Sequence, residues 1–204
     1  GLAYNAVEAH KQSLDALKKT ITINPNFGFA HYELAKIYQI ILNDDLAIKH
    51  FELAKKEISN DDLNYQLGLL YYKNEQYLKA MDPLKEYILK NLGDVETLEI
   101  LAFTFMNISR YPEAIDIYLR LINLKLNEEQ KDSHVDIIDN INDFNESLYL
   151  QNIAKSYYEL KDFDRAIEYF IKLLGINQDN YDTLVSIGII LNKKNSFIES
   201  EKYL

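Results

Sequence analysis

Residues 152–173 read NIAKSYYELKDFDRAIEYFIKL, and the pattern of this stretch decides the fold. Its apolar side chains recur three and four positions apart, which is the spacing that places them on one face of an α-helix. The same spacing continues along almost the whole chain, which holds only three prolines and six glycines. No segment alternates apolar and polar residues as a half-buried strand does. The sequence therefore predicts an all-α protein of amphipathic helices joined by short turns.

Four further windows align with this stretch, so the chain is built of repeats. They are ELAKIYQIILNDDLAIKHFELA at 33–54, QLGLLYYKNEQYLKAMDPLKEY at 66–87, ILAFTFMNISRYPEAIDIYLRL at 100–121 and SIGIILNKKNSFIESEKYL at 186–204. Each window has a large apolar residue, then a small one, and an aromatic residue or leucine three positions later. We expect the small residues to let two helices approach closely; they are Ala35, Gly68, Ala102, Ala154 and Gly188.

This pattern resembles the tetratricopeptide repeat (TPR), whose signature is Leu-Gly and then Tyr on a first helix, and Ala and then Phe on a second helix. The resemblance covers nearly the whole chain and implies a right-handed α-solenoid, in which helix pairs stack because no pair can bury its apolar face alone. We expect a single solenoid domain over residues 1–204. Its units would lie at about 28–60, 61–94, 95–128 and 147–180, with partial units at 1–27 and 181–204 and an insertion at 129–146.

The two ends of the sequence fall inside repeat units. Gly1 and Tyr4 fit the first-helix columns of the opening unit, and Ser13 and Leu17 fit its second-helix columns. Neither end has the polar outer face of a terminal repeat, so we expect a fragment of a longer solenoid. Self-association through the exposed solenoid ends is a further hypothesis.

The insertion at 129–146 reads EQKDSHVDIIDNINDFNE. It predicts an extra helix near 133–146, or a lengthened first helix in the unit that begins at 147. Its acids step by three and four positions on the side of the helical wheel opposite Ile137, Ile141 and Phe144. Two interpretations of these acids stay open. They form either an acidic face that docks a basic partner, or a solvated face on a helix that only packs against its neighbours. The acids are Asp132, Asp136, Asp139, Asp143 and Glu146.

The 204 residues carry a formal net charge of −10 and no cysteine. Residues 128–146, with seven acids and one lysine, supply −6 of this charge, so the rest is nearly neutral. We expect no nucleic-acid partner, because such surfaces need a basic stripe. Without cysteine, disulfides, thiolate zinc sites and cysteine nucleophiles are excluded. No run of about 18 apolar residues occurs, so we expect no membrane insertion.

The resemblance also implies a binding groove, because the first helices of TPR units line a concave face that commonly holds a peptide. The inward positions here are mostly aromatic and apolar, as in many protein interfaces. Packing against the neighbouring first helix is an equally open explanation for each side chain. The candidate groove residues are Phe29, Tyr32, Lys36, Tyr65, Leu69, Tyr72, Phe103, Met106, Lys155 and Tyr158, with Glu99, Gln151, Val185 and Ile189 beside them.

Two specialised TPR grooves do not fit these positions. A clamp for a terminal carboxylate needs several cations and amides on successive first helices, whereas the corresponding places here hold one cation, Lys36, and an acid, Glu96. A ladder of asparagines that grips a peptide backbone is also excluded, since its column reads Glu33, Gln66, Ile100, Asn152 and Ser186.

The sequence holds no motif for catalysis. Its histidines, His10, His31, His50 and His134, have no metal-ligand spacing, and its glycines form no phosphate-binding loop. We therefore expect a non-enzymatic scaffold that binds a protein or peptide segment and uses no cofactor. The alternative is a substrate-selecting or regulatory arm of a larger enzyme or sensor. The cytoplasm is favoured slightly, and the periplasm stays open because a leader could precede Gly1.

Overall fold

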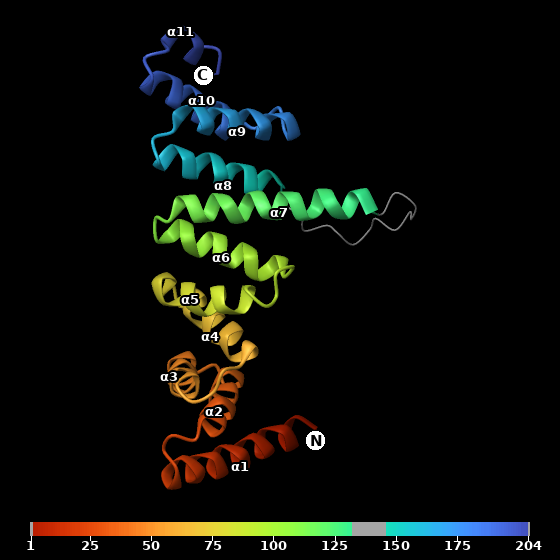
Figure 1. The fold of residues 1–204 in the computed structure, drawn as a ribbon, viewed down its shortest axis with the longest axis vertical. Helices are drawn as coiled ribbons and strands as arrows, with labels where there is room; N and C mark the ends of the chain where they lie inside the picture. Colours follow the sequence, from red (N-terminus) through yellow and green to blue (C-terminus); the bar gives the residue numbers. More distant parts are fainter. Residues whose placement is uncertain (1, 132–145, 204) are drawn as a thin grey trace. The chain divides into compact units, whose positions relative to one another are not determined.

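The computed structural model describes residues 2–131 and 146–203, with side chains for 11–124 and 146–203. These residues form eleven α-helices and no strand, which confirms the all-α prediction. The helices are α1 (Leu2–Ile23), α2 (Gly28–Ile40), α3 (Asp44–Lys55), α4 (Asp61–Lys73), α5 (Tyr77–Ile88), α6 (Val95–Asn107), α7 (Tyr111–Lys131), α8 (Glu146–Glu159), α9 (Phe163–Ile176), α10 (Tyr181–Lys193) and α11 (Phe197–Ser200) (Figure 1).

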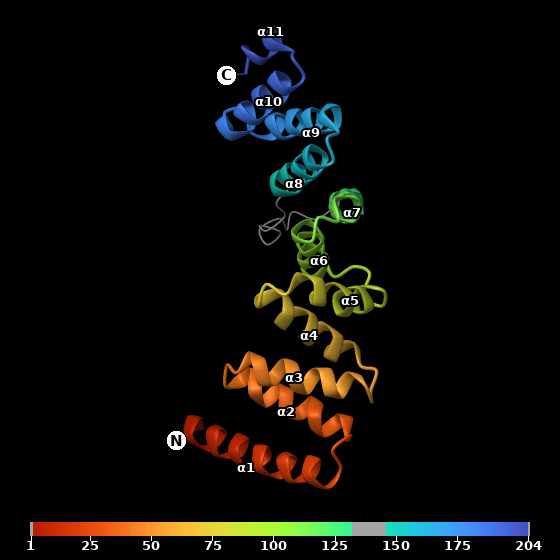
Figure 2. The ribbon, with the colours of Figure 1, turned by 90° about the vertical axis from the view of Figure 1, so that its left-hand side faces the viewer.

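The chain divides into two compact units, Gly1–Leu92 with α1 to α5 and Gly93–Leu204 with α6 to α11. Within each unit the helices follow one another in chain order (Figures 1 and 2). In the first unit α2 packs on α3 and α4 on α5, and α1 on α2 and α3 on α4 join the pairs. In the second unit the pairs are α6 with α7, α8 with α9 and α10 with α11, and α7 on α8 and α9 on α10 join them. A single domain over residues 1–204 stays a prediction.

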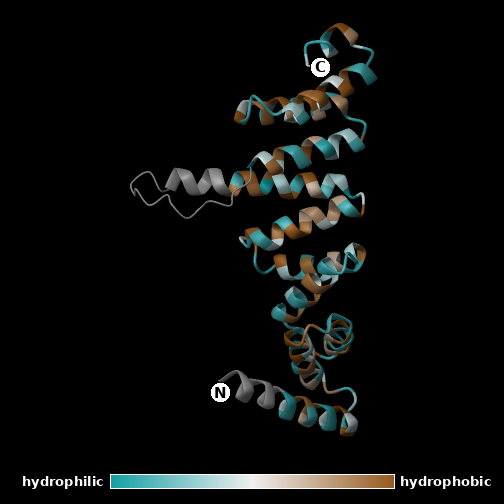
Figure 3. Ribbon diagram, turned by 180° about the vertical axis from the view of Figure 1, so that it is seen from behind, coloured by the Kyte–Doolittle hydropathy of each residue, from teal (hydrophilic) through white to brown (hydrophobic). Residues whose placement is uncertain are grey.

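The core of each helix pair is built on the small residues of the repeat. Ala35, Ala102 and Ala154 are fully buried on first helices. Their partners on the second helices are also fully buried alanines, which are Ala47, Ala80, Ala114 and Ala166. In Figure 3 hydrophobic residues recur along the helices between hydrophilic ones, as expected where one face of each helix packs inward.

Each pair turns at a residue in the left-handed helical region. The φ angle is 57° at Leu42, 56° at Glu75, 59° at Ser109, 63° at Lys161 and 60° at Asn195. The next N–H donates a hydrogen bond to the carbonyl of the aromatic or leucine column of the repeat, as in a Schellman motif. These carbonyls belong to Tyr38, Tyr71, Phe105, Tyr157 and Leu191, and the N···O distances are 2.8 to 2.9 Å.

Five of the described helices, α3, α4, α6, α9 and α10, begin at a side-chain cap. The side-chain oxygen of Asn43 accepts a hydrogen bond from the N–H of Leu46 at 3.1 Å, which starts α3. Asp162 does the same for Arg165 at the start of α9, also at 3.1 Å. Such caps satisfy N–H groups that have no partner inside the helix.

The opening partial unit differs from its alignment with the repeat. Residues Leu2–Ile23 form one helix of 22 residues, where the columns of Gly1, Tyr4, Ser13 and Leu17 place a helix pair. Residues 5–12, NAVEAHKQ, include good helix formers, so the helix continues through the position of the turn.

The insertion at 129–146 is described at its two ends. Residues 129–131 continue α7, which has 21 residues where the second helices α3 and α5 have 12. Glu146 begins α8, a first helix of 14 residues. The helix predicted near 133–146 lies outside the described residues except at Glu146, and Asp132, Asp136, Asp139 and Asp143 lie outside them too.

Candidate functional site

A cleft of about 530 Å³ lies in the second unit. This volume is within the range of roughly 300 to 1,000 Å³ that is usual for ligand sites. The lining is mainly apolar and aromatic, and it comes from three first helices and two second helices. The lining residues are Phe103, Met106 and Asn107 of α6, Tyr111 of α7, Lys155, Tyr158 and Glu159 of α8, Phe170 of α9, and Ser186, Ile189 and Ile190 of α10.

Helical spacing explains why these residues meet. Phe103 and Met106 are three positions apart on α6, and Lys155 and Tyr158 are three apart on α8, so each pair lies on one helix face. All four were predicted from the inward positions of the repeat, and the structure brings them together in the cleft with Ile189. Two other inward residues, Gln151 and Val185, are outside its lining.

The cleft has a buried base and accessible walls. Phe170 and Ile190 are buried, so they are fixed by the core of the second unit. Phe103 is 41% exposed and Ile189 is 46% exposed, although both are large and apolar. A bound group can therefore contact these two side chains without any rearrangement of the core.

Tyr158 is held in place by its neighbours. The Lys193 ammonium donates a hydrogen bond to the Tyr158 hydroxyl, and its Nζ lies 4.6 Å from the ring centroid. The Nζ of Lys161 lies 5.9 Å from the same centroid, and the ring of Phe163 lies 5.8 Å away. Cations over a tyrosine ring interact favourably with its π-electrons. This arrangement fixes the orientation of Tyr158 at the cleft.

A polar network joins α8 to the helices before it. The Tyr149 hydroxyl donates a hydrogen bond to Glu99 of α6, and the ring of Tyr149 stacks on Tyr118 of α7 at 5.7 Å. The side-chain N–H of Asn152 donates to the Tyr118 hydroxyl at 3.0 Å. Burial, with smaller contributions from the hydrogen bond and the charge of Glu99, raises the pKa of Tyr149 well above its ordinary value. Glu99, an inward position of the repeat, thus helps to position α8.

The other six predicted groove residues belong to the first unit. Tyr32 is only 9% exposed, and its hydroxyl donates to Asp62. Burial and this carboxylate raise its pKa. Tyr65 lies 4.9 Å from the ring of Tyr87, and Tyr72 lies 5.9 Å from the ring of Tyr77.

The remaining three of these six residues are more accessible. Phe29 is exposed, while Lys36 and Leu69 are partly exposed. Lys36 lines a separate cavity of about 560 Å³ with residues of α1 and α2, and Leu69 lines one of about 180 Å³. The six residues therefore do not share one cavity.

Several lining residues were missed by the sequence prediction. Tyr111 is the clearest case, because it stands in an aromatic column at the start of second helices, with Tyr77, Phe163 and Phe197. That column could have identified it. Lys161 and Lys193, which are outside the lining, were also missed, because they follow no repeat column that indicates binding and reach Tyr158 from a turn and a helix end. The further missed residues are Asn107, Glu159, Phe170, Ser186 and Ile190.

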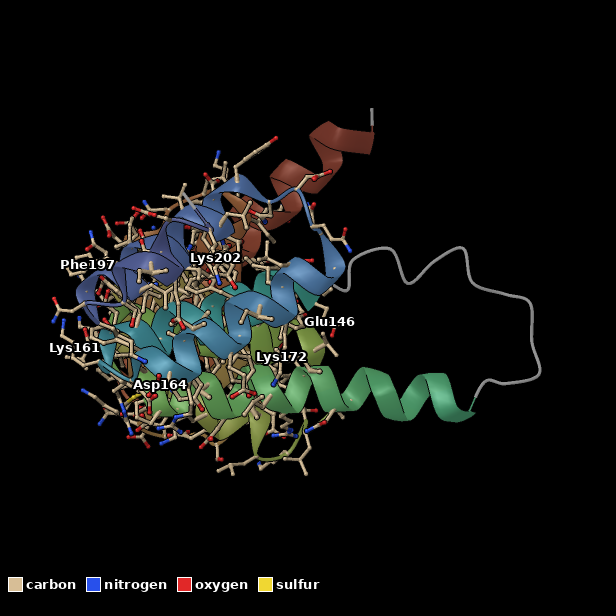
Figure 4. The ribbon with its side chains drawn as sticks, turned by 90° about the horizontal axis from the view of Figure 1, so that it is seen from above. Glu146, Lys161, Asp164, Lys172, Phe197 and Lys202 are labelled. Atoms are coloured by element: carbon tan, nitrogen blue, oxygen red, sulfur yellow. The ribbon has the colours of Figure 1, made fainter. Side chains whose placement is uncertain are left out.

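The predicted acidic docking face is described only at Glu146, which is partly exposed at the start of α8. Figure 4 shows Glu146 and Lys161 near opposite ends of this helix. Among the described residues no group of three or more His, Cys, Asp or Glu side chains could hold a metal ion. None of the helices in the described ranges is long and apolar enough to cross a membrane.

Two family models match parts of the sequence. The model of the anaphase-promoting complex, cyclosome, subunit 3, matches residues 42–121. The model of the tetratricopeptide repeat matches residues 148–180, which contain the α8–α9 pair. The chain is a tetratricopeptide-repeat protein. Its TPR pair α8–α9 supplies Lys155, Tyr158 and Glu159 to the cleft.

Solved structures support the same fold. A crystal structure of MamA has 21% sequence identity and a TM-score of 0.59, over 83% of this chain and 90% of MamA. YrrB, described as a TPR protein with an unusual peptide-binding site, has 20% identity and a TM-score of 0.61, over 88% of this chain and 84% of YrrB. At such identities the likeness shows the TPR solenoid fold alone, as predicted. No curated protein matches the chain in sequence.

Proposed function

We propose that this TPR protein is a non-enzymatic scaffold that binds a peptide or protein segment in the cleft of its second unit. The observation that carries the proposal is the meeting of Phe103, Met106, Tyr158 and Ile189 in one open cleft. The TPR fold is typical of protein interaction scaffolds, and YrrB is described as having a peptide-binding site. The lining fits such a ligand, because aromatic residues and methionine are enriched at protein interfaces.

The exposed apolar area indicates an affinity of moderate strength. Burying one leucine or phenylalanine side chain of a ligand contributes about 1.5 to 3 kcal/mol. Ordering an extended segment opposes this gain, because each immobilised flexible side chain costs about 0.5 to 1.5 kcal/mol. We expect a net binding free energy near −8 kcal/mol, which corresponds to a Kd of about 1 μM.

The test is a selection of peptides from a random display library on the whole chain. A labelled copy of an enriched peptide is then titrated with the unmodified protein and with two variants, Phe103→Ala and Ile189→Ala. Each variant should weaken binding by about tenfold, because each removes an exposed apolar contact of about 1.5 kcal/mol. Both residues are partly exposed, so the folded state should persist, as a thermal unfolding curve can verify.

The matched control is Phe197→Ala. Phe197 is 58% exposed, belongs to the same unit and is outside the lining of the cleft. The control should keep the affinity of the unmodified protein. Equal losses in all three variants, or none in the cleft variants, would refute the assignment of the cleft.

A further inference from the structure

We propose that the segment bound in the cleft carries Asp or Glu side chains on either side of its apolar anchor. This inference rests on the proposed function and names the class of segment that the cleft accepts. It follows from the charges around the apolar lining, which differ in sign from the net charge of the chain.

Three lysines surround Tyr158. Lys155 lines the cleft, and Lys161 and Lys193 lie over the Tyr158 ring. None of the three forms an ion pair with a residue that the structure describes. Among the described residues of the unit, four other cations do so, since Arg110 pairs with Glu113, Arg165 with Asp162, Lys172 with Glu168, and Lys194 with Asp164. The lysines around Tyr158 are therefore available to a ligand.

The local charge favours an acidic ligand. Within the lining Lys155 is offset by Glu159, so the positive excess comes from Lys161 and Lys193, which reach Tyr158 from outside the lining. An acidic segment meets this excess favourably, whereas a basic segment is repelled by it. The chain as a whole carries −10, so the surroundings of Tyr158 at the cleft are a local exception.

The position of the lysines favours side-chain carboxylates over a terminal carboxylate. Lys155 belongs to the cleft lining one helical turn before Tyr158, whereas Lys161 and Lys193 reach the Tyr158 ring. Two separate cationic points are best matched by two separate carboxylates. Acidic side chains along an internal segment provide them, and a single chain terminus does not.

The test compares peptide selections on three forms of the chain. The library is fused at its C-terminus to the phage coat protein, so no peptide has a free terminal carboxylate. The forms are the unmodified protein, the double variant Lys155→Glu and Lys161→Glu, and the control Lys202→Glu, which changes an exposed lysine outside the cleft lining. Lys155 and Lys161 are also exposed, so the double variant buries no charge.

We expect the unmodified protein and the control to enrich peptides with an apolar anchor and flanking Asp or Glu. The double variant should prefer basic flanks, and it should bind the acidic peptides about tenfold more weakly, because two exposed ion pairs become repulsions. Enriched peptides without an excess of acids, or an unchanged preference in the double variant, would overturn the inference. If those peptides still need Phe103, the proposed function survives that result.

Discussion

At the scale of single residues, close packing between paired helices depends on the small residues of the repeat. A Cβ added at Gly68 would lie 2.7 Å from both Cγ and Cδ2 of Leu84 and 3.3 Å from its backbone nitrogen. Leu84 is fully buried, so it has little space in which to move. The separation of α4 and α5 is thus set by the absence of one side chain.

We expect Gly68→Ala to lower the free energy of unfolding by about 1 to 3 kcal/mol, because overpacking shifts side chains and backbone. The matched variant is Gly175→Ala, in which the new Cβ meets no heavy atom within 4 Å on α9. It should raise the free energy of unfolding by about 0.5 kcal/mol, because alanine favours a helix over glycine. Urea denaturation measures both. A loss of stability in Gly175→Ala equal to that in Gly68→Ala would contradict the packing argument.

The turn residues store backbone strain that glycine would relieve. Leu42 has a φ of 57° and is 81% exposed, so Leu42→Gly removes little buried area. We expect this variant to gain about 1 kcal/mol of stability in urea, because a left-handed conformation costs other residues about 1 to 2 kcal/mol. Asn195→Gly should gain less, since asparagine tolerates this conformation. A destabilised Leu42→Gly would show that the strain is absent or is compensated elsewhere.

At the scale of elements, a buried histidine pair joins α2 to α3. The Nδ1 atoms of His31 and His50 are 2.9 Å apart, and His31 Nε2 lies 2.8 Å from the carbonyl oxygen of Pro25. Because that carbonyl can only accept, neutral His31 carries its proton on Nε2 and accepts from His50 through Nδ1. Burial, followed by the charges of His31, Lys49 and Lys18, lowers the pKa of His50 to about 4.

This shift predicts that the first unit loses stability in acid. An unfolded chain takes up a proton at His50 below about pH 6.5, whereas the folded chain resists it until about pH 4. The free energy of unfolding should therefore fall as the pH drops through this window, by at most about 3 kcal/mol. Urea denaturation of the unmodified protein and of His50→Gln isolates the effect, and the variant should lose less. Parallel pH curves would rule out His50 as the source.

The sequence was enough to predict the helix pairs, because the repeat columns are fixed by packing inside each pair. The column matches of Gly1, Tyr4, Ser13 and Leu17 were not enough at the start of the chain, where the helix propensity of residues 5–12 gives one continuous α1. The candidate site was predictable on first helices, as Phe103 and Tyr158 show. The surroundings of Tyr32 could not be predicted in this way. Its hydroxyl donates to Asp62, which is 30 positions away in the sequence and becomes a neighbour only in the fold.

At the scale of the whole molecule, the predicted groove residues have different surroundings in the two units. The first unit holds aromatic inward residues that largely contact other aromatic rings, as Tyr65 and Tyr72 do. The second unit gathers five of its inward residues in one cleft, and two further lysines lie over its Tyr158 ring. We therefore propose that binding belongs to the second unit of a chain whose net charge is −10.

The most direct test of this assignment locates a bound peptide. A photoreactive benzoylphenylalanine replaces Phe103 in one form of the chain and Phe197 in another, and each is irradiated with the peptide that the library selects. Both side chains are exposed and lie in the same unit, so they differ mainly in their position relative to the cleft. We predict that the peptide is crosslinked at position 103 and not at position 197, as mass spectrometry can establish. Crosslinking at 197 alone, or equally at both positions, would contradict binding in the cleft.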